Sequence, residues 1–118
     1  MRVRRIVDLS VPVGPMTQVY PGDPVPRFEV HCTVAWDGFN LLHIDMGSQT
    51  GTHVDAPEHP GEVYPAHHLI ATAGGIIGEN FTNLGRVDFP DPFVSCLPLA
   101  LVDADGAPVR AVAMELEA

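Results

Sequence analysis

The chain has 118 residues and a mass of 12.7 kDa, a size that fits one domain with a modest core. Fifteen acidic residues face six basic ones, all arginines, and the net charge of −9 disfavours nucleic acid and anionic membranes as partners. Apolar residues make up 46% of the chain, which excludes a disordered protein, and the longest apolar stretch is too short to span a bilayer.

Short strands dominate the predicted elements, because 11 glycines and 12 prolines are spread along the chain. The first predicted strand covers residues 3–9 and leads into a proline-rich loop over residues 12–26. Alternating apolar residues predict strands over 28–36 and 40–46, joined as a hairpin at the turn Asp37-Gly38. Another short strand is expected over residues 52–55.

Beyond Pro57 the pattern weakens, and residues 58–68 are expected to form a loop. A short apolar piece at Ile76-Ile77 is followed by an expected helical turn within residues 80–87. Two further strands are predicted over 97–102 and 109–114, around a turn at residues 103–108. Together these elements predict the α/β class. We expect a single β-rich domain over residues 1–118 with few helices.

Several residues receive structural interpretations. Cys32, on the apolar parity of its strand, is expected in the core, and Cys96 is expected to be buried. Trp36 and Phe39 are expected in core or hairpin packing, with a role in a pocket as the alternative. Arg110 is expected to hold a carboxylate. Two cysteines make no disulfide framework, and Asp8 and Pro12 interrupt the apolar run that a signal peptide needs, so the cytoplasm is the simplest location.

Histidine is concentrated in one segment, since four of the six histidines lie between residues 53 and 68. On a strand, side chains two apart share a face, so His53 and Asp55 present an imidazole beside a carboxylate. Pro57 ends the strand and turns His59 back, which favours a divalent metal among these three donors. Further donors follow at His67, His68 and Glu79. The alternative is that these groups are only solvated or hydrogen-bonded. The sequence contains no HExxH or paired CxxC motif that would strengthen the interpretation as a metal site.

Three stretches of the chain resemble one known family. TGTHVDAPEH, residues 50–59, resembles the signature His-x-Gly-Thr-His-x-Asp-x-Pro-x-His of the cyclase family of metal-dependent hydrolases, which includes kynurenine formamidase (arylformamidase). IVDLSVPVGPMTQVYPGDP resembles the family's first strand and proline-rich loop. The ending resembles its last third, with a glutamate before an Asn-Leu helix and a Gly-x-Pro-x-Arg-Ala strand. The resemblance implies the family's swivelling β/α fold.

The resemblance also implies roles for individual residues. His53 and Asp55 match metal ligands, with Asp55 bridging two metals. His67 matches a ligand of the second metal, and Glu79 matches a carboxylate shared between them. His59 matches the histidine that donates and accepts protons.

Two more positions come from the same resemblance. Tyr20 stands where an aromatic residue lines the substrate pocket. Gln49 takes the place of the family's first histidine ligand, and its amide oxygen is a weaker zinc ligand than imidazole. The expected cofactor is therefore one or two divalent ions, zinc first, with a harder ion such as manganese as the alternative.

The activity implied is hydrolysis or cyclisation of a small amide, formamide (N-formylkynurenine-like) or lactone carbonyl through a metal-activated water. Family members are longer, and the centre of their fold is expected to be missing here between about residues 60 and 66. Such a loss uncovers sheet edges and apolar faces, which predicts a homodimer or higher homo-oligomer. The alternative function is a non-catalytic shortened homologue that binds metal, ligand or a partner chain.

Overall fold

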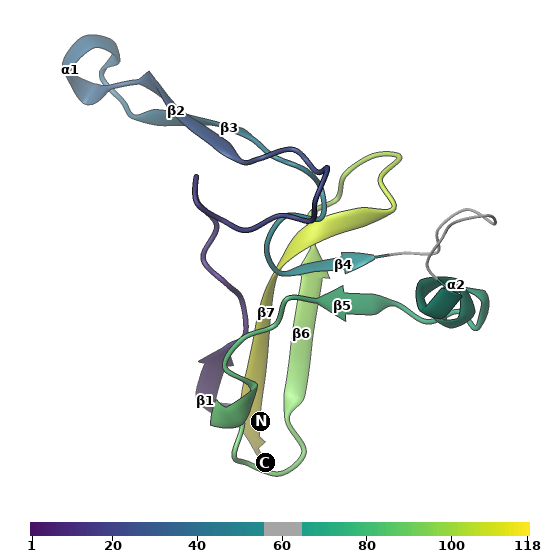
Figure 1. The fold of residues 1–118 in the computed structure, drawn as a ribbon. Helices are drawn as coiled ribbons and strands as arrows, with labels where there is room; N and C mark the ends of the chain where they lie inside the picture. The colour runs from purple at the N-terminus through teal and green to yellow at the C-terminus, as the bar shows by residue number, and fades with distance from the viewer. Residues whose placement is uncertain (56–64) are drawn as a thin grey trace.

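A five-stranded antiparallel sheet is the centre of the computed structural model, which describes residues 1–55 and 65–118 (Figure 1). Its longest strand, β7 (Gly106–Glu117), pairs near its start with β4 (His53–Asp55) and further along with β1 (Arg2–Asp8). β7 also pairs with β6 (Phe93–Pro98), and β5 (Ile77–Glu79) is added on β4. This arrangement brings the middle and the last third of the chain together around β4.

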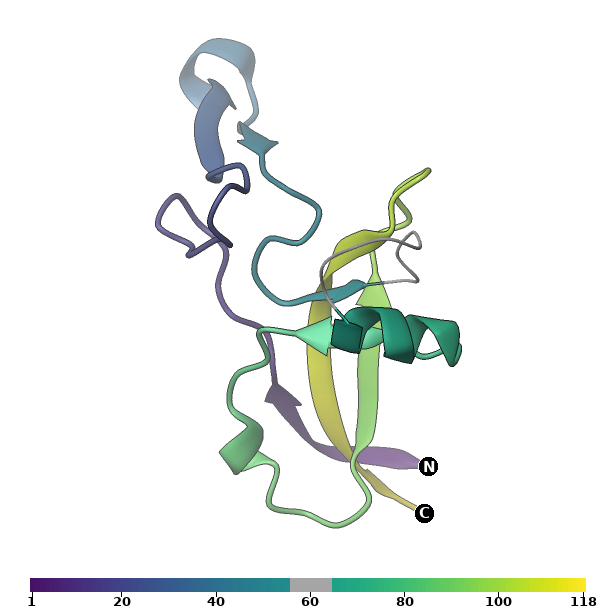
Figure 2. The same ribbon diagram turned by 45° about the vertical axis from the view of Figure 1, so that its right-hand side comes forward.

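A separate two-stranded sheet is formed by β2 (Arg27–Cys32) and β3 (Leu41–Asp45), with α1 (Val34–Asp37) at its tip. The other helical elements described are α2 (Pro65–Thr72) and the 3-10 turn η1 (Leu84–Arg86) (Figure 2). No helix in residues 1–55 or 65–118 is both long and apolar enough to cross a membrane. The β-rich fold with few helices and the predicted hairpin are thus confirmed.

The hydrophobic core is small and lies between the strands of the larger sheet and the segment after β5. Its buried members are Val7, Leu9, Phe89, Val109, Ala111 and Ala113. Cys96 is half-buried against this cluster, and burial raises the pKa of its thiol. The radius of gyration of the chain is 17.3 Å, whereas roughly 13–14 Å is typical of a compact domain of this length. The chain is therefore more open than its core-forming segments alone would require.

Three predicted elements differ from the structure. The strand expected over 28–36 ends at Cys32, because the Thr33 carbonyl accepts the Asp37 amide N–H at 2.8 Å and starts the helical turn α1. The loop expected over 58–68 was wrong from Pro65 onward, where α2 begins with a residue favoured in the first turn of a helix. The strand expected over 97–102 is β6, which starts at Phe93 and ends at Pro98.

Three residues expected in packed positions are more exposed than predicted. Trp36 is 91% exposed and Phe39 is 53% exposed, so neither packs in the core of this chain. Cys32 is only half-buried. The reason is that the β2–β3 hairpin stands away from the larger sheet, so the side chains on its apolar face do not reach the core (Figure 1).

The expected structural role of Arg110 is confirmed. Its guanidinium donates to both carboxylate oxygens of Asp8, from Nε at 3.0 Å and from a terminal nitrogen at 2.6 Å. Asp8 also accepts the Ser10 amide N–H at 3.1 Å. Arg110, followed by the Ser10 amide, holds the pKa of Asp8 below its ordinary value. This pair joins the end of β1 to β7.

We predict that Arg110→Gln lowers the free energy of unfolding at pH 7 by about 0.5–1 kcal/mol, as expected for an exposed but bidentate pair. Because the folded pKa of Asp8 lies below its unfolded value, this stabilisation is present above about pH 4 and is lost as pH falls through the folded pKa. Urea titrations at several pH values measure the difference. Arg4→Gln, which removes a single 3.6 Å contact with Glu115, is the control. Equal losses for the two variants, or a loss that persists in acid, would contradict the assignment.

Candidate metal centre

The register of β4 sets the positions of the candidate site residues. His53 lies directly opposite Glu79 of β5 and Pro108 of β7. Asp55, two residues further on, lies opposite Ile77 and Gly106. Because directly opposed residues and residues two apart share a face of a sheet, His53, Asp55 and Glu79 all lie on one face.

The segment that leads into β4 is held by short-range packing. Gly51 has a φ of +70°, and a Cβ there would lie 2.7 Å from Cγ2 of Val13, so both conformation and space require glycine. The buried hydroxyl of Thr52 donates to the Asn80 carbonyl at 2.8 Å and accepts the Val11 amide N–H at 2.9 Å. The Gly-Thr part of the signature therefore fixes the backbone that presents His53.

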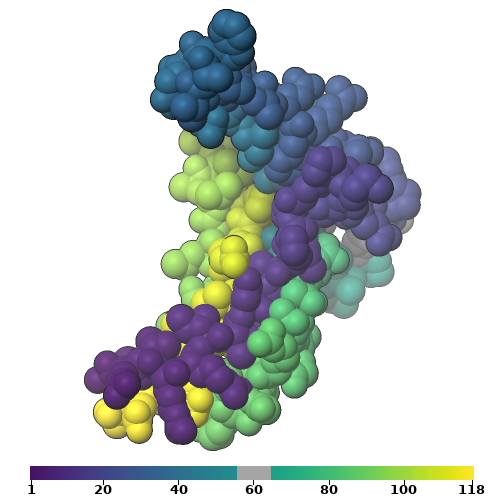
Figure 3. Space-filling view, turned by 90° about the vertical axis from the view of Figure 1, so that its left-hand side faces the viewer, coloured from purple at the N-terminus to yellow at the C-terminus, as the bar shows by residue number. Residues whose placement is uncertain are grey.

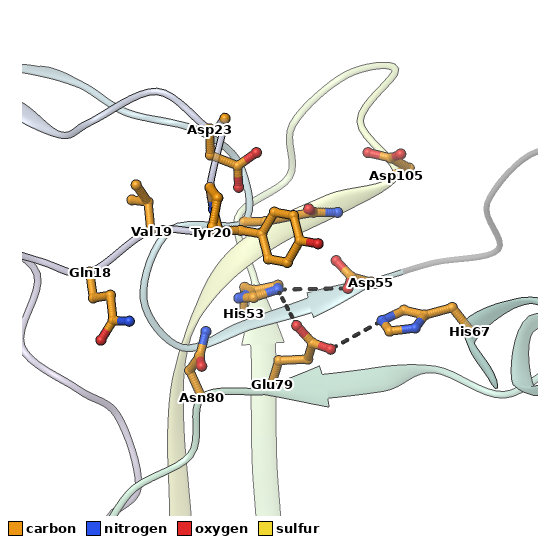
Figure 4. Close-up of a pocket in the computed structure, with 13 residues that line it drawn as sticks. Gln18, Val19, Tyr20, Asp23, His53, Asp55, His67, Glu79, Asn80 and Asp105 are labelled. Atoms are coloured by element: carbon orange, nitrogen blue, oxygen red, sulfur yellow. Dashed lines mark hydrogen bonds and ion pairs between the residues drawn. The ribbon is translucent and has the colours of Figure 1, made fainter. Parts of the chain in front are cut away.

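His53 is a buried imidazole with a defined orientation. Its Nδ1 lies 2.9 Å from the Gly51 carbonyl oxygen, which can only accept, so Nδ1 carries a proton. Its Nε2 points toward carboxylate oxygens, 3.6 Å from Oδ2 of Asp55 and 3.3 Å from Oε2 of Glu79 (Figure 4). With Nδ1 protonated, Nε2 of a neutral imidazole is an acceptor, and the two carboxylate oxygens that it faces are acceptors as well. Either a second proton on the imidazole or a cation shared by the three atoms is needed to hold them together.

Asp55 is a buried carboxylate with an unsatisfied atom. Its side chain is 4% exposed, and its Oδ1 has no hydrogen-bond partner in the described part of the chain. Burial, aided by the nearby Glu79 carboxylate and opposed by His53, raises the pKa of Asp55 above its ordinary value. A buried carboxylate costs free energy unless a cation or donors compensate for it. The space beside Oδ1 depends on Gly106, where a Cβ would lie 2.7 Å away.

Glu79 connects two imidazoles through different oxygens. Oε2 faces His53, while Oε1 lies 3.1 Å from Nε2 of His67 on α2. His67 is partly buried and its neighbour His68 is exposed, so the helix turns His67 rather than His68 toward the carboxylate. The four side chains form a continuous row along β4, β5 and the start of α2 (Figure 4).

A pocket of about 740 Å³ lies over this row. Tyr20 and Gln49, both predicted from the sequence, line it together with the four residues of the row. Asp23, Asn80 and Asp105 also line it and were missed. Asp23 belongs to the Pro-Gly-Asp-Pro loop and Asp105 to a turn, where acidic residues are common without a function, so nothing in the sequence separated them from surface aspartates.

The structure brings together the predicted site residues that lie within the described ranges. His53, Asp55, His67, Glu79, Gln49 and Tyr20 all line the same pocket. His59 lies outside the described residues, as does most of the region between 60 and 66 where the family's centre is expected to be missing.

The donor set fits a divalent cation. One atom each from His53, Asp55 and Glu79 can be chosen so that all three lie within 4.8 Å of one another. The imidazole orientation, the unpartnered Asp55 oxygen and the room beside Gly106 all fit an ion held among them. Imidazole with two carboxylates is a donor set that zinc and manganese both accept.

Comparison with known proteins gives the family. The family model for cyclases matches residues 7–113, nearly the whole chain, and the chain belongs to this family. A kynurenine formamidase from Bacillus cytotoxicus is 37% identical over 60 residues. That match covers 50% of this chain but only 29% of the enzyme's length.

Solved structures share the fold. A protein described as a predicted metal-dependent hydrolase from Bacillus stearothermophilus aligns with a TM-score of 0.72 and 17% identity, over 93% of this chain and 98% of its own. A protein described as a potential metal-dependent hydrolase with cyclase activity aligns with the same score and identity, over 95% of this chain and 99% of its own. At this identity the likeness establishes the fold.

We predict that Gly106→Ala destabilises the protein by about 1–3 kcal/mol, the usual cost of an added methyl group in a filled space. The new Cβ would displace Asp55 and approach Cγ of Gln49, 3.2 Å from its ideal position. Gly85→Ala is the matched control, because a Cβ at that position would meet no non-neighbouring atom within 4 Å in the described part of the chain. Thermal unfolding of the two variants measures the difference, and equal stabilities would show that the space beside Asp55 is not constrained.

Proposed function

We propose that this chain is a metal-dependent hydrolase that acts on a small carbonyl compound. The single observation that supports this most is the convergence of His53, Asp55 and Glu79 within 4.8 Å at the base of a large pocket. Membership in the cyclase family and the partial match to a kynurenine formamidase support the same class of reaction.

The cation ligands in this proposal are Nε2 of His53, Oδ2 of Asp55 and Oε2 of Glu79. Glu79, through the oxygen that faces His67, and His67 itself would hold a second ion. Gln49 lines the same pocket and could add an amide oxygen. Zinc is our first assignment, and the two carboxylates with an amide make manganese the alternative.

A divalent cation bound there would supply a Lewis acid that polarises a carbonyl and lowers the pKa of water. The residues that the structure describes would contribute by where they place charge, hydrogen-bonding groups and an aromatic ring. Asp55 and Glu79 concentrate negative charge where the cation is needed, while Gly51 fixes the tautomer of His53 through its carbonyl. Tyr20 offers an aromatic face above the row of ligands (Figure 4). We assign proton transfer to His59, on the strength of its place in the family signature.

The charge of the pocket favours certain substrates. Asp23 and Asp105 line it in addition to Asp55 and Glu79, and none of the lining residues in the described chain is an arginine. A cation held by Asp55 and Glu79 would leave Asp23 and Asp105 unneutralised near the pocket walls. We therefore place neutral amides, formamides and lactones, and those with an ammonium group, ahead of anionic compounds. An N-formylkynurenine-like formanilide carries both an ammonium and a carboxylate group at neutral pH, so it counts among the compounds without net charge.

A second candidate is a non-catalytic homologue that binds a cation, a ligand or a partner chain. The amide of Gln49 at a position lining the pocket favours it, because an amide is a weaker ligand than imidazole. For both candidates we propose the cytoplasm, a reducing compartment suited to the free cysteines Cys32 and Cys96.

We predict that the purified protein binds zinc or manganese and that His53→Ala and Glu79→Gln each weaken this binding at least about 10-fold. Isothermal titration with each ion measures affinity, and elemental analysis after gel filtration measures the number of ions per chain. His43→Ala is the control, since His43 is an exposed histidine on β3. Less than about a tenth of an ion per chain after reconstitution, or equal affinities for all variants, would contradict the site.

We predict that the metal-loaded protein hydrolyses formanilides and that His59→Ala lowers kcat by about 100-fold or more while leaving cation affinity unchanged. A formanilide with an ammonium side chain should have a higher kcat/KM than its carboxylate counterpart. Cation binding without hydrolysis of any formanilide, ester or lactone tested would favour the non-catalytic candidate. Equal rates for wild type and His59→Ala would remove His59 from the mechanism.

A further inference from the structure

Asn80 follows the candidate ligand Glu79 directly and has an unusual backbone conformation. Its φ is +57°, a left-handed value that glycine, asparagine and aspartate adopt more readily than other residues. The pairing of β4 with β5 ends one residue earlier, where Glu79 lies opposite His53. Gly51, two residues before His53, is left-handed as well, with a φ of +70°. Both segments therefore leave regular strand geometry close to a candidate ligand, and other contacts must hold them there.

Two side-chain hydrogen bonds join the segments at this point. The Asn80 side chain donates from Nδ2 to the Gly51 carbonyl at 3.0 Å. The Thr52 hydroxyl donates to the Asn80 backbone carbonyl at 2.8 Å. The same Gly51 carbonyl also lies 2.9 Å from Nδ1 of His53. One carbonyl oxygen thus accepts hydrogen bonds from both the His53 imidazole and the Asn80 amide.

The chemistry at position 80 accounts for asparagine there. Glycine would adopt the left-handed conformation but has no side chain that could donate. Aspartate tolerates the conformation, but its ionised carboxylate offers only acceptors to the Gly51 carbonyl. Asparagine combines tolerance of this turn with a neutral N–H donor. The donor is therefore the feature that distinguishes Asn80 from these two alternatives.

The segment that carries Asn80 is held against the start of the chain. Ser10 and Phe81 form an isolated bridge, and Figure 3 shows the start of the chain, in purple, lying along the green segment that follows β5. Asn80 itself is exposed and lines the pocket above the candidate ligands (Figure 4). Because Gly51 is buried, the Asn80 amide reaches from the pocket wall to a buried residue.

We infer that Asn80 is a positioning residue for the His53 imidazole and acts through the Gly51 carbonyl. A carbonyl held by the Asn80 amide stays directed at Nδ1, and this bond keeps Nε2 turned toward Asp55 and Glu79. Groups that orient an imidazole through its other ring nitrogen raise its affinity for a metal. The effect on a cation rests on the proposed function, whereas the hold on the imidazole can be measured without a metal.

Asn80→Gly separates the amide from the turn, because glycine keeps the left-handed conformation and removes only the side chain. Asn83→Gly is the matched control. Asn83 has a φ of +58°, is exposed, and donates from Nδ2 to the Asp8 carbonyl at 2.9 Å. It is not among the described residues that line the pocket. The control therefore loses an equivalent hydrogen bond at a place that does not touch His53.

Exchange of the His53 Nδ1 proton with water, followed by NMR in the metal-free protein, measures the bond to Gly51. We expect exchange about 5-fold faster in Asn80→Gly than in wild type or Asn83→Gly, a factor that corresponds to one hydrogen bond. Isothermal titration should show zinc affinity about 5-fold weaker in Asn80→Gly and unchanged in Asn83→Gly.

Equal proton exchange in the two glycine variants would overturn the inference, as would equal zinc affinities when the wild type binds zinc. A wild type that binds no zinc would contradict the proposed function alone, and the proton exchange would then decide whether Asn80 positions the imidazole.

A reciprocal measurement covers the case in which Asn80→Gly fails to fold. His53→Ala removes the other donor to the Gly51 carbonyl, so the side-chain amide protons of Asn80 should exchange with water faster than in wild type. The side-chain amide protons of Asn83 are the internal reference and should not change. Unchanged exchange at Asn80 in His53→Ala would overturn the inference.

Discussion

The pairing of β4 between β7 and β5 is the constraint on which the rest of the site depends. Only three residues, His53 to Asp55, form this strand, yet they pair with segments that lie at least 22 residues (β5) and 51 residues (β7) away in the sequence. A shift of one residue in either pairing would turn His53 and Asp55 to the opposite face and Glu79 away from them. The site is therefore a property of sheet register more than of any local motif.

The signature around His53 acts largely by holding that register. Gly51 allows the backbone to pass Val13, and its carbonyl accepts both the His53 Nδ1–H and the Asn80 side-chain amide. The Thr52 hydroxyl joins the segments at Val11 and Asn80. These contacts bring the first loop, β4 and the end of β5 together, so residues without any chemical role position the imidazole.

The identity of most site residues could be predicted from the sequence, although the register that brings them together could not. The two-residue period placed His53 beside Asp55, and His67 and Glu79 stood downstream as further donors. The family resemblance gave these residues roles and added Tyr20 and Gln49. All six residues line one pocket. Asp23 and Asp105 could not be found, since their convergence depends on long-range folding. Trp36 was misplaced for a different physical reason: the alternating pattern continues to residue 36, but β2 ends at Cys32 and Trp36 lies in the helical turn α1, at the tip of a hairpin that stands away from the larger sheet.

The central claim is that His53, Asp55 and Glu79 hold a divalent cation. The most direct test is anomalous diffraction at the zinc or manganese absorption edge from crystals grown with that ion. The account predicts a peak bonded to Nε2 of His53 and to oxygens of Asp55 and Glu79, with Nδ1 of His53 still directed at the Gly51 carbonyl. A saturated crystal with no peak among these three side chains, or with His53 turned away from both carboxylates, would contradict it.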